Sequence, residues 1–292
     1  MASKRTILLY GRTRSGKSTQ IGELAEHVYK TTKKLTRLYT ADRGGTDPVK
    51  PYIDLGIIEL VEQGDTDAWI FLNKAVRGYV RDKSGKWVQG ANDNIGVFAF
   101  ESMTAFADAI MADMAKKAAA GISIGGGANV SFAVSGDGET LKISGSNMAM
   151  YGIAQARITE EVWQSQQLNA PFILWTASVS KDDDMSASGK VLGPAVVGKS
   201  LTHEVPRWFG LTFRIDALPA QGGKPERHIL YLGNHLDVAA GNAVGLGNTR
   251  TPLDAAPLPP SIEPASLVKA LELIDGGYSK ALEVIKARLG KA

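Results

Sequence analysis

The chain has 292 residues, of which 44% are hydrophobic and 22% are charged, and its formal net charge is +3. This composition is that of an ordinary globular protein, and the small net charge does not indicate a strongly basic nucleic-acid binder. Because the sequence has no cysteine, disulfides and thiol catalysis are excluded. The apolar run after Lys4 and Arg5 is too short for a signal-peptide core, and no run reaches the ~20 residues of a membrane span. We therefore expect a cytoplasmic protein with no membrane partner.

The first predicted elements surround a phosphate-binding pattern. Residues 11–18 read G-R-T-R-S-G-K-S, which fits G-x-x-x-x-G-K-[ST]. The apolar run 6–10 before it is typical of a buried strand, and residues 17–30 after it have helical spacing. In this arrangement backbone N–H groups surround phosphate oxygens, the lysine reaches the β- and γ-phosphates, and the serine hydroxyl ligates Mg²⁺. The candidate nucleotide-binding residues are Gly11, Arg14, Ser15, Gly16, Lys17, Ser18 and Thr19, with Ser18 also a metal ligand.

Strands and helices alternate along the following residues, which predicts an α/β fold with a mostly parallel, twisted sheet flanked by helices. Further strands are expected at 36–40, 57–61, 95–100 and 171–179, and helices at 68–80, 104–120 and 148–167. Hairpins are expected around 82–86 and within a Gly/Ser-rich insertion at 121–147. The strands at 208–215 and 228–232 are expected to pair antiparallel with each other, as additions to the sheet.

Composition divides the chain into three parts. Residues 1–250 form the predicted α/β core, residues 251–264 form a Pro-rich linker, and residues 265–292 form a C-terminal helical segment. Gly276 and Gly277 are expected to interrupt that last segment.

A second stretch, residues 193–200, also fits the phosphate-binding pattern. Only Val191 and Leu192 stand where a strand should precede it, and its loop holds a proline and two valines. Proline has no N–H, and valine disfavours unusual φ values, so these residues are poorly suited to a loop whose N–H groups must converge on a phosphate. We therefore expect the first stretch to be the nucleotide site and the second to be a loop with its own packing role.

Two carboxylates follow predicted strands, as nucleotide hydrolysis requires. Glu101 directly follows the apolar strand 95–100, at the sheet edge where ligands bind, which suits a metal-side acid. A surface glutamate at a strand end is the alternative interpretation. Asp42 follows the strand 36–40 and is a candidate for polarising the attacking water, although an aspartate before two glycines is also an ordinary turn residue.

The chain resembles the RecA-like P-loop ATPases, and within them the small phage-type ATPases of single-strand annealing and recombination. The resemblance rests on the strand, loop and helix at 6–30, the segment 39–42 followed by Asp47 and Pro48, and the strand ending at Glu101, and it covers roughly residues 6–250. It implies a RecA-like fold, ATP and Mg²⁺ as ligands, and ATP hydrolysis. It also implies assembly into a homo-oligomeric ring or filament. The implied partners are single-stranded DNA or a single-strand-binding or annealing protein, in the host cytoplasm if the chain is phage-encoded.

The resemblance also assigns roles to two residues beyond the loop. Thr176 lies in the strand whose polar end senses the γ-phosphate, and residues 189–199 match a family loop. Arg250 takes the place of a residue offered to the nucleotide of a neighbouring subunit, with a solvated arginine as the alternative.

The chain departs from the family in its acids and in its DNA-binding loops. The family carries Asp on the metal side and Glu on the water side, whereas this chain has Glu101 and Asp42, which predicts slow hydrolysis. The loops at 121–146 and 180–189 contain more acidic than basic residues, although phosphate neutralisation normally supplies most affinity for DNA. A nucleotide-gated interaction protein with little turnover and no DNA contact is therefore the alternative function. The four histidines are scattered, and none predicts a zinc site.

Overall fold

A computed structural model describes residues 4–42, 44–64, 66–119, 147–179, 191–197, 199–220, 225–237, 243–249 and 258–289. The predicted insertion at 121–147, apart from its last residue, lies outside the described residues, as do the loop at 180–189 and Arg250.

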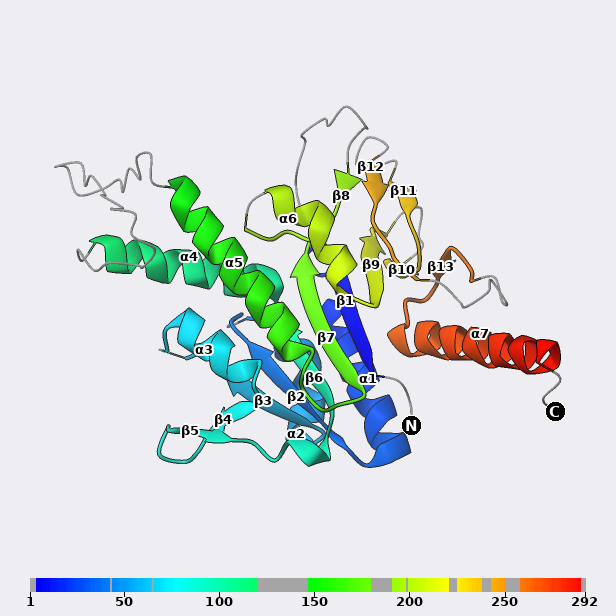
Figure 1. Cartoon of the computed structure of the whole chain (residues 1–292), viewed down its shortest axis with the longest axis horizontal. Coiled ribbons are helices and arrows are strands. Elements are labelled where there is room, and N and C mark those ends of the chain that lie inside the picture. The colour runs from blue at the N-terminus through cyan, green and yellow to red at the C-terminus, as the bar shows by residue number, and fades with distance from the viewer. Residues whose placement is uncertain are drawn as a thin grey trace.

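An eight-stranded mixed sheet forms the centre of the molecule (Figure 1). Its central strands are parallel, and β10 and β13 extend one side antiparallel, so the α/β class and the antiparallel additions are confirmed. The order across the sheet is β13 (Ser261–Ile262), β10 (Arg227–Tyr231), β9 (Leu211–Leu218), β1 (Arg5–Gly11), β7 (Phe172–Ser178), β6 (Ile95–Glu101), β2 (Leu35–Thr40) and β3 (Ile58–Glu62).

Helices cover both faces of the sheet. The helices α1 (Lys17–Thr32) and α7 (Leu267–Arg288) pack on the face that carries Ile7 and Leu9, and α3 (Ala68–Ala75), α4 (Met103–Ala119) and α5 (Asn147–Ser165) pack on the face that carries Leu8 and Tyr10. Strand residues alternate between the faces, and here both faces are buried. This double burial explains why β1, β6 and β7 read as continuous apolar runs in the sequence.

Smaller elements surround this core. The strands β4 (Tyr79–Arg81) and β5 (Trp87–Gln89) form the hairpin predicted around 82–86. A three-stranded sheet contains β11 (His235–Asp237), β12 (Ala243–Gly245) and β8 (Val191–Leu192). The short helices are η1 (Asp47–Val49), α2 (Lys50–Asp54), η2 (Asn92–Asn94), α6 (Lys199–Glu204) and η3 (Val205–Trp208). Among the described residues, no helix combines the length and apolar character needed to cross a bilayer.

The predicted helix at 68–80 is too long. The helix α3 ends at Ala75, because Gly78 adopts a φ of 75° and the residues after it pair with β5. A left-handed glycine is incompatible with continuing the helix, so the chain turns there into a strand.

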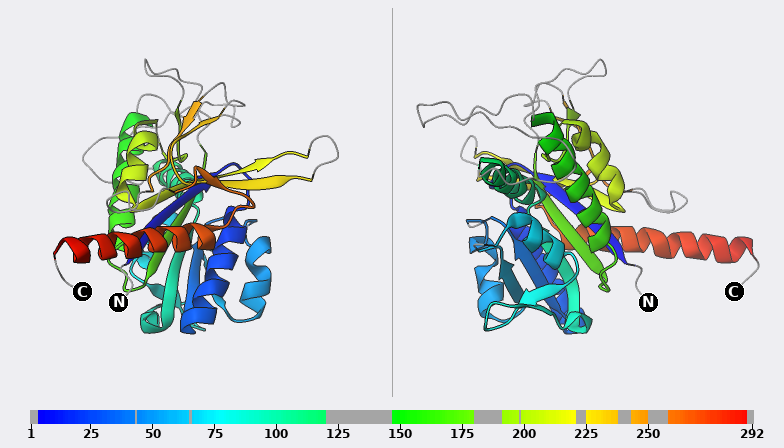
Figure 2. Two further views of the ribbon diagram at one scale, coloured as in Figure 1. Left: turned by 90° about the vertical axis from the view of Figure 1, so that its right-hand side faces the viewer. Right: turned by 60° about the vertical axis from the view of Figure 1, so that its left-hand side comes forward.

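The C-terminal part also differs from its prediction. The described end of the predicted linker contains β13, which pairs with β10, and the N–H of Ala265 donates to the carbonyl of His228 at 2.9 Å. The helix α7 continues through Gly276 and Gly277, because its buried residues, including Gly277, pack against the body and this packing outweighs the low helix propensity of glycine. Figure 2 shows α7 beside α1 with its far end extending past the sheet.

Candidate functional site

Two glycines shape the loop between β1 and α1. A Cβ on Gly11 would lie 2.1 Å from the carbonyl oxygen of Ile215 and 2.7 Å from Oγ of Ser15, so only glycine fits there. Gly16 adopts a φ of 96° immediately before α1, a left-handed conformation that side chains disfavour. The loop therefore turns sharply and directs the N-terminus of α1 toward the edge of the sheet.

The Lys17 side chain folds back into this loop. Its Nζ donates to the carbonyl oxygens of Gly11 at 3.0 Å and Arg12 at 2.9 Å. Burial lowers the pKa of Lys17, and the nearby carboxyl groups of Glu101 and Asp42 oppose that change. Backbone carbonyl groups thus hold the ammonium group at the loop. An anion is a stronger hydrogen-bond acceptor than a carbonyl and can replace them.

Glu101 lies at the end of β6 and contacts the start of α1. It is 4% exposed, and the Ser18 hydroxyl donates to its Oε1 at 2.5 Å. Its Oε2 is buried and has no hydrogen-bond partner among the described residues. Burial raises the pKa of Glu101 to about 7, against the opposing effects of the Ser18 hydrogen bond and the Lys17 charge. The predicted pair of metal-side residues is therefore brought together.

A cleft of about 570 Å³ opens at the carboxyl ends of the parallel strands. Ligands bind at this edge in open α/β sheets, where loops from several strands meet. The loop contributes Thr13, Arg14 and residues 16–19, the segment after β2 contributes Asp42, Gly44, Gly45 and Pro48, and the remaining lining residues are Glu101, Ser102, Ser178 and His228.

Asp42 lines this cleft and is also a turn residue. Its side chain is exposed, and its Oδ1 accepts a hydrogen bond from the N–H of Gly44 at 3.1 Å. Its own N–H donates to Oγ1 of Thr40 at 3.0 Å. The local turn therefore fixes a carboxylate that faces the cleft.

Thr176 does not line the cleft, in contrast to the role that the resemblance assigned to it. In the register of β1 and β7, Thr176 pairs with Leu9, whereas Ser178 pairs with Gly11 at the start of the loop. Thr176 is fully buried, and its hydroxyl has no hydrogen-bond partner among the described residues. The strand β7 ends at Ser178, two residues beyond Thr176, so Ser178 is the polar residue at its end.

Two other predicted site residues lie outside the cleft lining, and a third belongs to it. Gly11 and Ser15 are buried and are not part of the cleft lining, so they shape the loop on the side that packs against the protein. Arg14 lines the cleft and is exposed.

His228 is a site residue that the sequence did not reveal. Its Nδ1 lies 3.0 Å from the carbonyl oxygen of Ser15, so an Nδ1–H donates to the loop. The antiparallel strand β10 brings it there from more than two hundred positions away, and no local pattern marks that contact.

The second stretch that fits the phosphate-binding pattern packs against the protein itself, as predicted. The N–H of Ala195 donates to the carbonyl of Ser178 at 2.7 Å, and its carbonyl accepts from the Thr104 hydroxyl at 2.6 Å. The carbonyl of Val197 accepts from Nε2 of Gln155 at 2.9 Å. These backbone groups are used within the fold.

The residues at the cleft fit a magnesium ion that also binds a phosphate. Mg²⁺ is usually held by one or two protein oxygens together with water and substrate phosphates. Ser18 and Glu101 supply such oxygens, and the unpartnered Oε2 of Glu101 supports the fit. In the described part of the chain, no group of three or more His, Cys, Asp or Glu side chains forms a metal-binding cluster, so a closed all-protein site is not indicated.

The comparisons with known proteins identify no relative, so the interpretation of the site rests on its geometry. No protein-family model matches the chain, and a comparison with curated proteins finds no match.

Proposed function

We propose that the chain is a RecA-like P-loop ATPase that binds ATP with Mg²⁺ in this cleft and hydrolyses it slowly. One observation carries the proposal. A glycine-shaped loop, a partly buried lysine, and a Ser18–Glu101 pair 2.5 Å apart meet at the carboxyl edge of the parallel strands. This combination supplies N–H donors, a cation and metal ligands for a polyphosphate.

Each part of the loop has a defined role in binding. The N–H groups of residues 16–19 and the positive end of α1 face the phosphates. Lys17 exchanges its carbonyl partners for phosphate oxygens, which are stronger acceptors. When Mg²⁺ is bound by Ser18 and Glu101, it would neutralise part of the phosphate charge.

Asp42 is the residue proposed to orient or deprotonate the attacking water. Its carboxylate faces the cleft but is one methylene shorter than glutamate and already accepts the N–H of Gly44. A carboxylate that is hydrogen-bonded within its own turn is poorly placed to contact the attacking water. Misplacement of about 1 Å costs roughly 100-fold in rate. Slow turnover follows from this constraint.

The resemblance supports coupling of this ATPase to assembly of a homo-oligomer and to annealing or recombination of single-stranded DNA. The constrained Asp42 favours the second candidate, a nucleotide-gated interaction protein in which ATP orders an oligomer without efficient turnover and without DNA contact. The two candidates share the nucleotide site and differ in the response of the rate to DNA.

The test measures ATP binding and hydrolysis for the wild type and Lys17→Ala, each with and without single-stranded DNA. Lys30→Ala is the matched control, because Lys30 lies on the same helix, is exposed and pairs with Glu26. We expect Lys17→Ala to weaken ATP binding about 10- to 100-fold, since it removes charge-assisted hydrogen bonds, and Lys30→Ala to leave it unchanged. ATP binding that is equal in all three proteins would overturn the proposal. A rate that DNA stimulates supports the annealing ATPase, and a slow rate that ignores DNA supports the gated interaction protein.

A further inference from the structure

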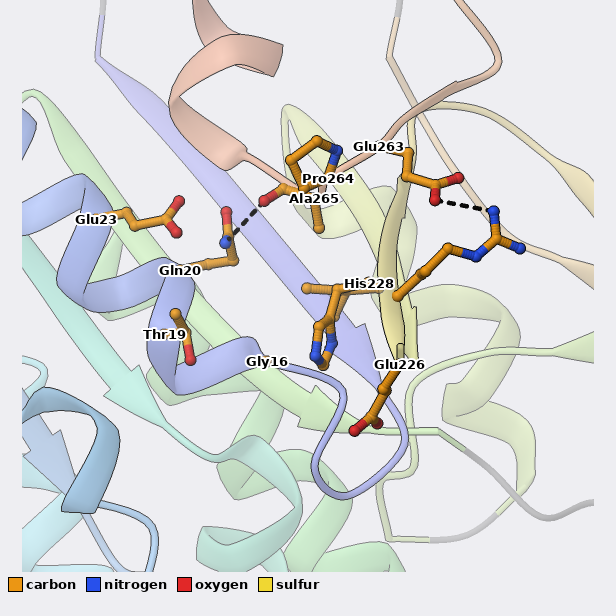
Figure 3. A pocket seen from close by; sticks show the side chains of 11 residues that line it. Gly16, Thr19, Gln20, Glu23, Glu226, His228, Glu263, Pro264 and Ala265 are labelled. Carbon is orange, nitrogen blue, oxygen red and sulfur yellow. Dashed lines mark hydrogen bonds and ion pairs between the residues drawn. The ribbon is translucent and has the colours of Figure 1, made fainter. Parts of the chain in front are cut away.

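A second pocket, of about 360 Å³, adjoins the phosphate cleft (Figure 3). The two hollows share Gly16, Thr19 and His228. Its volume falls within the ~300–1,000 Å³ typical of ligand sites. A molecule that fills both hollows therefore passes over the first turn of α1.

The back wall of this pocket is built by contacts between distant parts of the chain. The Gln20 side chain donates from Nε2 to the carbonyl of Ala265 at 3.2 Å and accepts from the N–H of Leu267 at 2.5 Å. The N–H of Ala265 donates to the carbonyl of His228 at 2.9 Å. These bonds join α1, β10 and the start of α7, so the pocket is formed before any ligand enters.

The two hollows differ in chemistry. Lys17, Ser18 and Glu101 line only the phosphate cleft, which suits an anion with its metal ion. The second pocket is lined by Glu23, Glu226 and Glu263, the last in an ion pair with Arg227 at 3.0 Å. Ionised carboxylates are acceptors only, so this pocket disfavours phosphate and favours a group that donates hydrogen bonds.

Glu23 is the glutamate best placed to make such a contact. It lies one turn after Thr19 on α1, is partly buried, and Figure 3 shows its carboxylate turned toward Gln20 and the pocket. None of the pocket's described lining residues is Phe, Tyr or Trp, and the imidazole of His228 is bonded to the loop through Nδ1, so Glu23 is the lining group that can distinguish ligands by accepting a hydrogen bond.

We propose that this pocket holds the nucleoside of the bound nucleotide and that Glu23 determines specificity by accepting a hydrogen bond from it. The donor is a ribose hydroxyl or an exocyclic amino group of the base. The inference rests on the proposed nucleotide site and adds where the nucleoside lies and which residue distinguishes a nucleoside triphosphate from inorganic triphosphate.

The experiment measures dissociation constants, with Mg²⁺ and the full chain, for ATP, 2′-deoxy-ATP, inosine triphosphate and inorganic triphosphate. The variant is Glu23→Gln, and the matched control is Glu26→Gln, because Glu26 lies on the same helix, pairs with Lys30 and does not line the pocket. Thermal unfolding verifies that both variants are folded. We expect the wild type to bind ATP at least about 10-fold more tightly than inorganic triphosphate.

Glu23→Gln is expected to weaken ATP binding about 10-fold while leaving inorganic triphosphate binding and the control unchanged. A preference for ATP over 2′-deoxy-ATP that disappears in Glu23→Gln identifies a ribose hydroxyl, and a preference over inosine triphosphate that disappears identifies the amino group. Equal binding of ATP and inorganic triphosphate by the wild type would overturn this inference and leave the phosphate site standing. An equal loss for both ligands in Glu23→Gln would also overturn it. Failure of the wild type to bind either ligand would instead refute the proposed function.

Discussion

The buried carboxyl group of Glu101 gives a prediction about stability that needs no nucleotide. Burial raises its pKa from 4.5 to about 7. The folded state therefore binds this proton more tightly than the unfolded state, and between these two values it binds more protons. The free energy of unfolding consequently falls as pH rises through this window. Below pH 4.5 the group is protonated in both states and the penalty is absent, whereas above pH 7 the penalty is complete.

The magnitude follows from the two pKa values. A difference of about 2.5 units at 1.36 kcal/mol per unit gives a penalty of about 3 kcal/mol at pH 8 and about 1 kcal/mol at pH 5. Glu101→Gln removes the ionisation and retains an oxygen that can accept from the Ser18 hydroxyl. The variant is therefore expected to gain about 3 kcal/mol over the wild type at pH 8 and about 1 kcal/mol at pH 5.

The assay is urea unfolding of both proteins from pH 5 to pH 8, in EDTA and without nucleotide, so that no metal ion binds the carboxylate. Glu62→Gln is the control, because Glu62 ends β3 of the same sheet, which β2 separates from β6, and is exposed. The reasoning is refuted if the advantage of Glu101→Gln is the same at pH 5 and pH 8, or if the variant is less stable than the wild type at pH 8.

Three further predictions test the loop and its neighbours. Gly11→Ala is expected to destabilise the fold by about 3 kcal/mol or more in urea unfolding, because its Cβ would meet the Ile215 carbonyl at 2.1 Å; a loss below about 1 kcal/mol would contradict this. Thr176→Val is expected to raise the free energy of unfolding by about 1 kcal/mol, since it removes a buried hydroxyl without a described partner. The same variant is expected to leave the rate of ATP hydrolysis unchanged, whereas Ser178→Ala is expected to slow it. The reverse pattern of rates would return the γ-phosphate-sensing role to Thr176. Asp42→Glu is expected to raise turnover about 10-fold if the reach of the acid limits it, measured against Asp42→Asn; equal rates in the two variants would show that Asp42 does not contact the water.

The sequence predicted those parts of the site that are contiguous along the chain. The strand, the loop and the helix from Arg5 to Thr32 carry their signals in apolar runs and glycines, and each signal describes its own neighbourhood. Glu101 was predictable for a related reason, because a carboxylate directly after a fully buried strand must emerge at the sheet edge.

The parts that were missed depend on register and on long-range pairing. To distinguish Ser178 from Thr176, one must know the register of β1 and β7, in which Ser178 pairs with Gly11. No local sequence pattern encodes this register. His228 comes from β10, and the pocket residues Glu263 and Pro264 come from the segment that was predicted to be a linker. That segment was predicted to be a linker because of its prolines, and the pairing of its described end with β10 depends on residues distant in the sequence.

The exchanged lengths of the two acids have different consequences at the two positions. Glu101 spans the distance from the end of β6 to the start of α1 and meets the Ser18 hydroxyl at 2.5 Å, so the longer side chain is satisfied there. An aspartate at that position would retract the carboxylate by about 1.5 Å and break the contact. Among the described residues Asp42 has no comparable hydrogen bond across the cleft, and the hydrogen bond from Gly44 holds it within its own turn. Under the proposed function, the exchange therefore preserves the metal-binding side of the site and weakens the side that would activate water, so the choice between an efficient ATPase and a nucleotide-gated binder depends on Asp42.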